Sequence, residues 1–172
     1  AETGTFGVRN LDTGKAVGAD TVFRLASVSK TITAQLAGLL VHDGVMAWND
    51  PVRLSLPKLR FADPRLNDGL EIQHLLSHTT GVVPYAFDSS LEEGQSLDRI
   101  LPGFARQRAI CPPGQCFTYQ NVLFSLSTRH LERAGRDSFE ALVQERIFKP
   151  LDMASASIGI DGLQRSDNAA AP

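Results

Sequence analysis

Apolar side chains recur at helical spacing in the segment from about Ser27 to His42. They repeat every three or four residues, at Ile32, Leu36, Leu39 and Leu40. This spacing puts them on one face of an amphipathic helix. Gly44 follows directly and is a suitable residue to end that helix.

Four later segments carry the same kind of pattern. They are residues 70–81, 97–108, 122–134 and 138–150. In the first of them, acidic Glu71 falls in the first turn and Gly81 stands at the end. In the last, Ser138 is a suitable N-cap and Pro150 ends the helix. We therefore predict a largely helical region after residue 26.

The other segments are predicted to be extended or irregular. Residues 4–18 consist of short extended segments around the turn LDTGK, residues 11–15. Residues 48–69 contain three prolines, which block long regular elements, and residues 82–96 form a polar loop. Strand-like segments thus come first and helices follow, which is typical of an α+β fold. The chain contains too little strand for a complete sheet.

Composition narrows the possible functions. The 172 residues suggest one domain, and a hydrophobic content of 42% is enough for a core. The net charge is −2 without a basic run, so we expect no nucleic-acid partner. Apolar stretches are short and interrupted by charge, so we expect no segment that spans a membrane.

Cys111 and Cys116 enclose a Pro-Pro-Gly turn and are the two cysteines of the chain. A short-loop disulfide between them would indicate an oxidising compartment. Two free thiols are the alternative, and a metal site is less favoured because it needs two more ligands. His74 and His78 also have a metal-binding spacing, but no glutamate follows His74. We expect His78 to be packed or hydrogen-bonded, and we predict no metal site.

Ser27 and Lys30 are candidates for a nucleophile and its proton partner. A serine hydroxyl attacks only when a neighbouring group takes its proton, and three residues along a helix bring two side chains together. A lysine takes part as a base only when its pKa falls below the usual 10.4 or so. The same spacing recurs at Ser55 and Lys58, where Pro57 interrupts the segment. Ser27 is therefore the better candidate.

Four blocks of sequence carry a family resemblance. They are FRLASVSKTITA (23–34), LLSHTTG (75–81), PPGQCFTYQN (112–121) and FEALVQERIFKPLDM (139–153). In this order they resemble the serine β-lactamase and penicillin-binding-protein-like hydrolases. The nearest branch contains class C β-lactamases, D-Ala-D-Ala carboxypeptidases and esterases. The resemblance implies a β-lactamase/transpeptidase-like α+β fold, present here mostly as the helical lobe plus a stub of the antiparallel-sheet α/β lobe.

The resemblance also implies roles for particular residues. Ser27 would be acylated, Lys30 would be its proton partner, and Tyr119 would act as a base or proton relay through its phenol. Asn121 would hydrogen-bond the substrate and the lysine. No cofactor is implied, and the substrate would be a small molecule or derived from peptidoglycan. The location would be periplasmic or secreted in a bacterium, or cytoplasmic for a member of the esterase branch.

One element of the family is missing from the sequence. No Lys-Thr-Gly or His-Thr-Gly follows Asn121, although this element supplies an oxyanion donor and holds the substrate carboxylate in the family. Gln120 also replaces the more common serine or alanine. We therefore expect one partial domain over 1–172, with a strand stub (1–26), the nucleophile helix (27–44), a mainly helical lobe (45–160) and a tail (161–172).

Three functions follow from these observations. The first is a serine hydrolase that acts through an acyl-enzyme on β-lactams, D-Ala peptides or small esters. The second is a non-hydrolytic penicillin-binding or sensor protein on the same scaffold. The third is an inactive fragment, since half of the oxyanion hole is not encoded.

Overall fold

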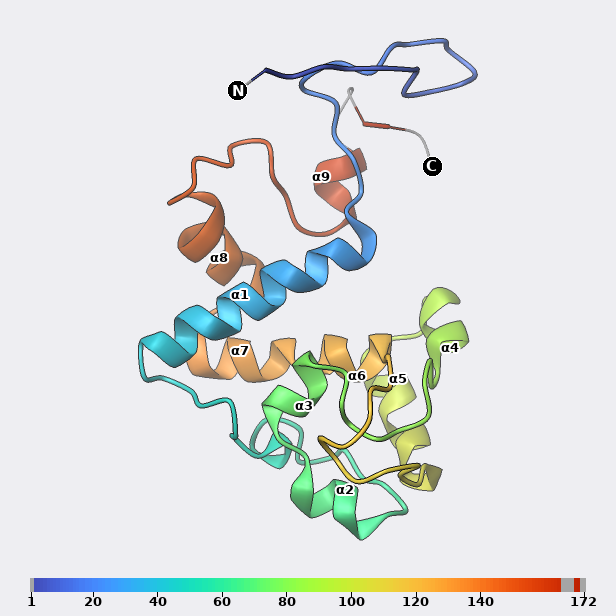
Figure 1. Ribbon diagram of the computed structural model, residues 1–172, viewed down its shortest axis with the longest axis vertical. Coiled ribbons are helices and arrows are strands. Elements are labelled where there is room, and N and C mark those ends of the chain that lie inside the picture. The colour runs from blue at the N-terminus through green and yellow to red at the C-terminus, as the bar shows by residue number, and fades with distance from the viewer. Residues whose placement is uncertain (1, 165–168, 171–172) are drawn as a thin grey trace.

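The computed structural model describes residues 2–164 and 169–170, and it consists of a helical body with an N-terminal extension (Figure 1). The α-helices are α1 (Ser29–His42), α2 (Pro64–Gly69), α3 (Ile72–Leu76), α4 (Asp88–Glu92), α5 (Leu97–Ile100), α6 (Asn121–Leu126), α7 (Thr128–Gly135), α8 (Phe139–Val143) and α9 (Ile160–Gln164). Short 3₁₀ turns are η1 (Ala26–Val28), η2 (Val52–Leu54) and η3 (Leu101–Arg106), and η4 (Gln144–Phe148) is a π-helical turn.

Helix α1 crosses the middle of the molecule and packs against α7 and α8 (Figure 1). Its buried face contains Leu36 and Leu40, as the apolar spacing predicted. Burying a leucine side chain contributes about 1.5–3 kcal/mol, so this face fixes the helix in the body. The predicted helix is confirmed, except that it begins at Ser29 and that Ser27 lies in the preceding turn η1.

The core lies among α1, α3, α6, α7 and the segments that connect them. Its largest fully buried apolar side chains are Phe104, Leu36, Leu40, Leu66, Ile72, Leu75, Leu123, Leu126, Leu131, Val82 and Val122. These side chains come from both halves of the sequence. The core therefore holds α1 and α6 in one body.

The segment predicted as one helix over residues 122–134 forms two helices. The interruption lies at Ser127, whose hydroxyl donates to the carbonyl of Phe124, while the Thr128 hydroxyl donates to Ser125. Such local bonds from side chain to backbone compete with the helical ladder. Similarly, the helix predicted over 97–108 forms α5 and then the 3₁₀ turn η3, because Pro102 has no N–H to donate.

Several predicted boundaries were wrong for local reasons. Helix α3 ends at Leu76 rather than near Gly81, because His78 adopts a left-handed φ of 58°. Glu71 caps this helix instead of lying in its first turn. Helix α2 lies in the segment predicted as a loop, where Asp63 accepts from the N–H of Arg65 as the N-cap. Pro64 stands at its first position, which favours a helix start.

Two more helices lie where the pattern predicted none. Helix α4 occupies part of the predicted polar loop 82–96, and α9 begins at Ile160. Both are five residues long, too short to show a periodic pattern. Of the predicted tail (161–172), residues 161–164 belong to α9, and residues 165–168 and 171–172 lie outside the described residues.

The N-terminal residues form a small hairpin, in which the predicted short extended segments lie on either side of the predicted turn. Val8 pairs antiparallel with Ala16, and Arg9 N–H donates to Lys15 at 2.8 Å. Phe6 is 88% exposed and Leu11 is 90% exposed, so this hairpin adds little to the core. Together with a Val22–Ala169 bridge, it forms the strand-like part at the upper end of Figure 1, and a further isolated bridge pairs Pro51 with Glu71 in the helical body. The described residues thus form a helix-rich fold with little strand.

None of the described helices has both the length and the apolar character needed to cross a bilayer.

Candidate active site

Ser27 lies in the 3₁₀ turn η1, directly before α1, and its side chain is exposed. Ala26, the preceding residue, has a φ of 46°. A non-glycine residue in this left-handed region carries conformational strain. Ser29 is directed elsewhere, since its hydroxyl donates to the carbonyl of Ala26 at 2.6 Å. The turn therefore presents Ser27 alone of the two serines toward Lys30.

Lys30 joins two predicted site residues. Its Nζ donates to Ser27 Oγ at 3.0 Å and to Asn121 Oδ1 at 2.8 Å. Ser27 lies in η1 and Lys30 in the first turn of α1, and side chains three residues apart along such a helical segment lie on the same face. Nζ also lies 5.1 Å from the ring centre of Tyr119 and 5.4 Å from that of Phe124. The positive charge is thus held against two aromatic faces.

Tyr119 comes from the segment before α6, and its hydroxyl lies 2.7 Å from Ser27 Oγ. Hydrogen bonding with Lys30 and then with Ser27 lowers the pKa of Tyr119 from its usual 10.0, although burial and the charge of Asp88 act to raise it. Because Ser27 Oγ accepts from Lys30, its own O–H is free to donate to Tyr119. The arrangement can therefore move the Ser27 proton onto the Tyr119 oxygen.

Asn121 is the first residue of α6, with Gln120 at the N-cap position. Its side chain therefore does not serve as the N-cap of this helix. Its side-chain amide instead accepts from Lys30 through Oδ1 and donates from Nδ2 to Asp88 Oδ2 at 2.7 Å. The structure thus brings together all four residues that the sequence selected: Ser27, Lys30, Tyr119 and Asn121.

His78 supports Tyr119 from behind. The two rings stack at 4.4 Å between centres, and a second stacking contact at 5.3 Å reaches Phe124. Burial, and then the charge of Lys30, lower the pKa of His78, which favours a neutral ring. Its Nδ1 accepts from the N–H of Gln120 at 3.2 Å. The expectation of a packed, hydrogen-bonded His78 is confirmed.

Two chain segments form the frame that carries Tyr119. Residues 78–85 exchange backbone hydrogen bonds with residues 110–119, among them Thr118 N–H to His78 at 2.7 Å and Tyr85 N–H to Tyr119 at 2.9 Å. Gly81 has a φ of 78°, and a Cβ there would overlap the carbonyl oxygen of Cys111. Only glycine combines this backbone conformation with so close an approach.

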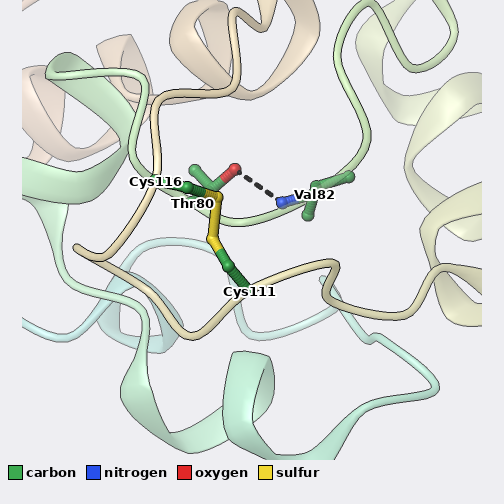
Figure 2. Close-up of a disulfide and its surroundings, with 4 residues drawn as sticks. All are labelled: Thr80, Val82, Cys111 and Cys116. Atoms are coloured by element: carbon green, nitrogen blue, oxygen red, sulfur yellow. Dashed lines mark hydrogen bonds between the residues drawn. A yellow bond between two sulfur atoms is a disulfide. The ribbon is translucent and has the colours of Figure 1, made fainter.

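A disulfide joins Cys111 to Cys116 beneath this frame (Figure 2). Beside it, the Thr80 hydroxyl accepts from the N–H of Val82 at 3.2 Å. The bridge closes the short loop that leads to Tyr119, so it reduces the freedom of that segment before folding.

Gln120 is fully buried. Its side-chain nitrogen donates to the carbonyl of Val83. The unusual residue between Tyr119 and Asn121 is therefore part of the packing between the two frame segments.

The sequence did not indicate that Asp88 belongs to the site, or that His78 packs against Tyr119. Asp88 lies in a segment predicted as a loop, and nothing in its neighbours indicates that it reaches Asn121. His78 could have been found from its place in LLSHTTG. As for a metal, His74 Nδ1 accepts from the N–H of Glu71, and no group of three or more metal-binding side chains occurs in residues 2–164 and 169–170.

Comparison with known proteins gives one family and a consistent set of relatives. The profile of the family described as Beta-lactamase matches residues 2–172. An esterase, EstB of Burkholderia gladioli, is 34% identical over 86% of this chain and 41% of its own length. Penicillin-binding protein 4 of Amycolatopsis lactamdurans is 32% identical over 86% of this chain and 39% of its own. A beta-lactamase of Yersinia enterocolitica is 27% identical over 95% and 41%.

Among solved structures, the octameric penicillin-binding protein homologue from Pyrococcus abyssi has the same fold. It matches with a TM-score of 0.80 at 24% identity, over 96% of this chain and 39% of that one. This chain thus spans about two fifths of the length of these relatives. The matched part is the helix-rich portion described above, in agreement with the predicted helical lobe and strand stub.

Proposed function

The chain belongs to the beta-lactamase family, and from that premise we propose that the protein is an active-site serine hydrolase that acts through an acyl-enzyme. The observation that carries the proposal is the set of contacts around Ser27 Oγ, with Tyr119 OH at 2.7 Å and Lys30 Nζ at 3.0 Å. Both distances are those of hydrogen bonds that transfer or stabilise a proton. The substrates we propose are β-lactams, D-Ala peptides or small esters.

In the proposed acylation, Ser27 Oγ attacks the carbonyl carbon while its proton passes to the Tyr119 oxygen. The positive charge of Lys30 favours the ionised phenol, in agreement with its lowered pKa. The tetrahedral intermediate then expels the leaving nitrogen or oxygen, which takes the proton from Tyr119. In deacylation, water attacks the Ser27 ester and gives its proton to Tyr119, and Ser27 recovers that proton when it leaves.

Asn121 has a separate role in this proposal. Its side-chain Oδ1 accepts a hydrogen bond from Lys30 and so holds that lysine in place. We propose that Asn121 also orients the substrate. The location we propose is the periplasm or the cell exterior. The Cys111–Cys116 disulfide supports it, because cytosolic thiols are kept reduced. Thiol titration of the protein isolated under alkylating conditions tests the location, and two free thiols would contradict it.

The test of function is covalent labelling of the intact protein with a fluorescent penicillin and with a fluorophosphonate. We expect an adduct on Ser27 with at least one probe, and its loss in Ser27→Ala. Ser55→Ala is the matched control, since Ser55 has the same spacing to a lysine. No Ser27-dependent adduct with either probe would refute the proposal.

Turnover separates the hydrolase from a binding protein. Continued release of product indicates a hydrolase, whereas a stoichiometric burst without turnover indicates a penicillin-binding or sensor role. We further propose that residues 1–172 alone do not turn over substrate, because no Lys-Thr-Gly or His-Thr-Gly follows Asn121 in them. Hydrolysis of nitrocefin or a nitrophenyl ester by these residues alone would contradict that.

A further inference from the structure

Asp88 is in contact with the candidate site but has no role in the acyl-transfer steps above. It is the first residue of α4, and its Oδ2 accepts from Asn121 Nδ2 at 2.7 Å. Its other oxygen, Oδ1, is buried and finds no hydrogen-bond partner within the described part of the chain. A buried carboxylate oxygen without a partner is costly. The position of this side chain therefore requires an explanation other than its own stability.

The partners of Asn121 give that explanation. An asparagine amide has nearly the same shape when turned over, so only its hydrogen-bond partners determine which end faces which neighbour. Lys30 offers only donors, and the Asp88 carboxylate offers only acceptors. With Oδ1 toward Lys30 and Nδ2 toward Asp88, both contacts are favourable. With the amide reversed, both would be repulsive.

The result is a continuous chain of hydrogen bonds from the carboxylate to the nucleophile. It runs from Asp88 to Asn121 at 2.7 Å, from Asn121 to Lys30 at 2.8 Å, and from Lys30 to Ser27 at 3.0 Å. We propose that Asp88 is a positioning residue of this site, whose carboxylate fixes the Asn121 amide and so holds Lys30 against Ser27. The predicted effect of Asp88 on the acylation rate rests on the proposed function, whereas the positioning of Asn121 and Lys30 does not.

The chain before Asp88 is built to hold it in place. Tyr85 and Phe87 both have left-handed φ values, 59° and 64°, which aromatic residues rarely adopt. Such strain persists only where the surroundings impose it, and it is frequent at functional sites. Asp88 therefore enters α4 in a direction fixed by two unusual backbone conformations.

Two contacts impose that conformation. The Phe87 ring packs edge-on against Phe104 at 4.8 Å between centres, and a Cβ on Gly103 would lie 2.7 Å from the same ring. On the other side, Tyr85 N–H donates to the carbonyl of Tyr119 at 2.9 Å. Asp88 is thus held between the core and the segment that carries Tyr119.

The experiment compares acylation rates of three variants of the intact protein with the fluorescent penicillin or fluorophosphonate. We expect Asp88→Ala to lower the rate constant by about tenfold to a hundredfold, the scale for lost positioning of a reacting group. Asp88→Asn should recover most of it, because its side-chain oxygen can still accept from Asn121. Glu92→Gln is the control, an exposed acid on the same helix, and should leave the rate unchanged.

A double-mutant cycle distinguishes positioning from a general structural effect. In an Asn121→Ala background, Asp88→Ala should cause no further loss, because its effect passes through Asn121. An equal additional loss in that background would refute the proposal. So would an Asp88→Ala protein that acylates at the wild-type rate, or an Asp88→Asn protein that is as slow as Asp88→Ala.

A second readout does not depend on acylation. The charged or titratable groups around Tyr119 are Lys30 from α1, His78 after α3, Tyr85, and Asp88 from α4. Asp88→Asn and Asp88→Ala both remove the negative charge that raises the pKa of Tyr119, but only Asp88→Ala also removes the acceptor of the Asn121 amide. Lys30 should then be held less well, so the pKa of Tyr119 should be higher in Asp88→Ala than in Asp88→Asn. Phenolate absorbance, with Tyr119→Phe as the blank, measures it. Equal Tyr119 pKa values in these two variants would contradict the proposal, even if the wild-type protein labelled with neither probe.

Discussion

Ser27 and Ser55 both precede a lysine by three residues, yet the fold gives them different partners. Ser27 Oγ contacts Lys30 Nζ and the Tyr119 hydroxyl. Ser55 Oγ lies 2.6 Å from Nδ1 of His130, and Lys58 is exposed. The spacing between two residues therefore says little until the backbone that carries them is known.

Local backbone explains the difference. Ser27 stands in a 3₁₀ turn that leads directly into a 14-residue helix, so Lys30 is held on the same face. Ser55 instead follows the turn η2, and Pro57 prevents a helix from continuing toward Lys58. As a result, the Ser55 hydroxyl hydrogen-bonds with His130 of α7, a helix far along the chain, instead of with Lys58.

The Ser55 region also contains the residue types of another hydrolytic site. His130 Nε2 lies 3.0 Å from Asp50 Oδ2, which completes a Ser-His-Asp chain. However, the N–H groups of Ser55 and Leu56 both donate to Val52, so they are not available to stabilise an oxyanion. His130 is also buried. These features indicate a structural network that joins the 50–55 segment to α7.

The largest expected effect distinguishes the two lysines. Lys30→Met should slow acylation of Ser27 by about a hundredfold to ten-thousandfold, the range for loss of a proton-transfer partner. Lys58→Met should change the rate by less than about twofold, because Lys58 is exposed and lies outside the site. Rate constants for labelling of the intact protein by the fluorophosphonate measure both. Equal losses of acylation rate in the two variants would show that Lys30 has no special role at Ser27.

The next effect concerns stability in the Ser55 region. His130→Ala removes a buried ring and leaves Ser55 and Asp50 without their shared partner. We expect it to lower the free energy of unfolding by about 2–4 kcal/mol. Urea denaturation measures this, with the exposed His42→Ala as the control. A folded His130→Ala protein should still acylate at Ser27, and loss of labelling in it would contradict a purely structural role.

Some features of the fold and of the site could be predicted from the sequence, and others could not. Long periodic segments such as that of α1 were predicted because their buried positions repeat at 3.6 residues. The Ser27 group was selected because four blocks of a family pattern occur in order. By contrast, α4 and the contact between Asp88 and Asn121 were not predictable, since they depend on the packing of Phe87 against Phe104. Such tertiary contacts leave no local pattern in the sequence.

The predicted ends of some helices were wrong for a related reason. The end of α3 coincides with the left-handed His78, whose ring stacks on Tyr119, a residue far along the chain. The break between α6 and α7 depends instead on two hydroxyls that bond back to the helix. Serine and threonine also occur inside unbroken helices, so their identity alone does not predict a break.

A smaller effect concerns the ionisation of Tyr119. Hydrogen bonding with Lys30 is the first cause of its lowered pKa, so Lys30→Met should raise that pKa toward its usual value. In the wild-type protein, the ionised phenol is then populated at a lower pH, and acylation should increase as pH rises through this pKa. In Lys30→Met the increase should move to higher pH. Phenolate absorbance against a Tyr119→Phe blank checks the direction, and a pKa that does not rise would contradict it.

The smallest effect is the one that most directly tests the comparison of the two serines. Ser55→Ala removes a single hydroxyl from His130, so it should cost about 1 kcal/mol of unfolding free energy and leave acylation of Ser27 unchanged. Ser27→Ala should do the reverse. Its side chain is exposed, so its removal should change stability by less than about 0.5 kcal/mol while abolishing the adduct. Urea denaturation and probe labelling of the same two preparations supply all four values. If either serine affected both quantities strongly, the two regions would be coupled through the 50–55 segment and α7, since that segment and α1 both pack on α7.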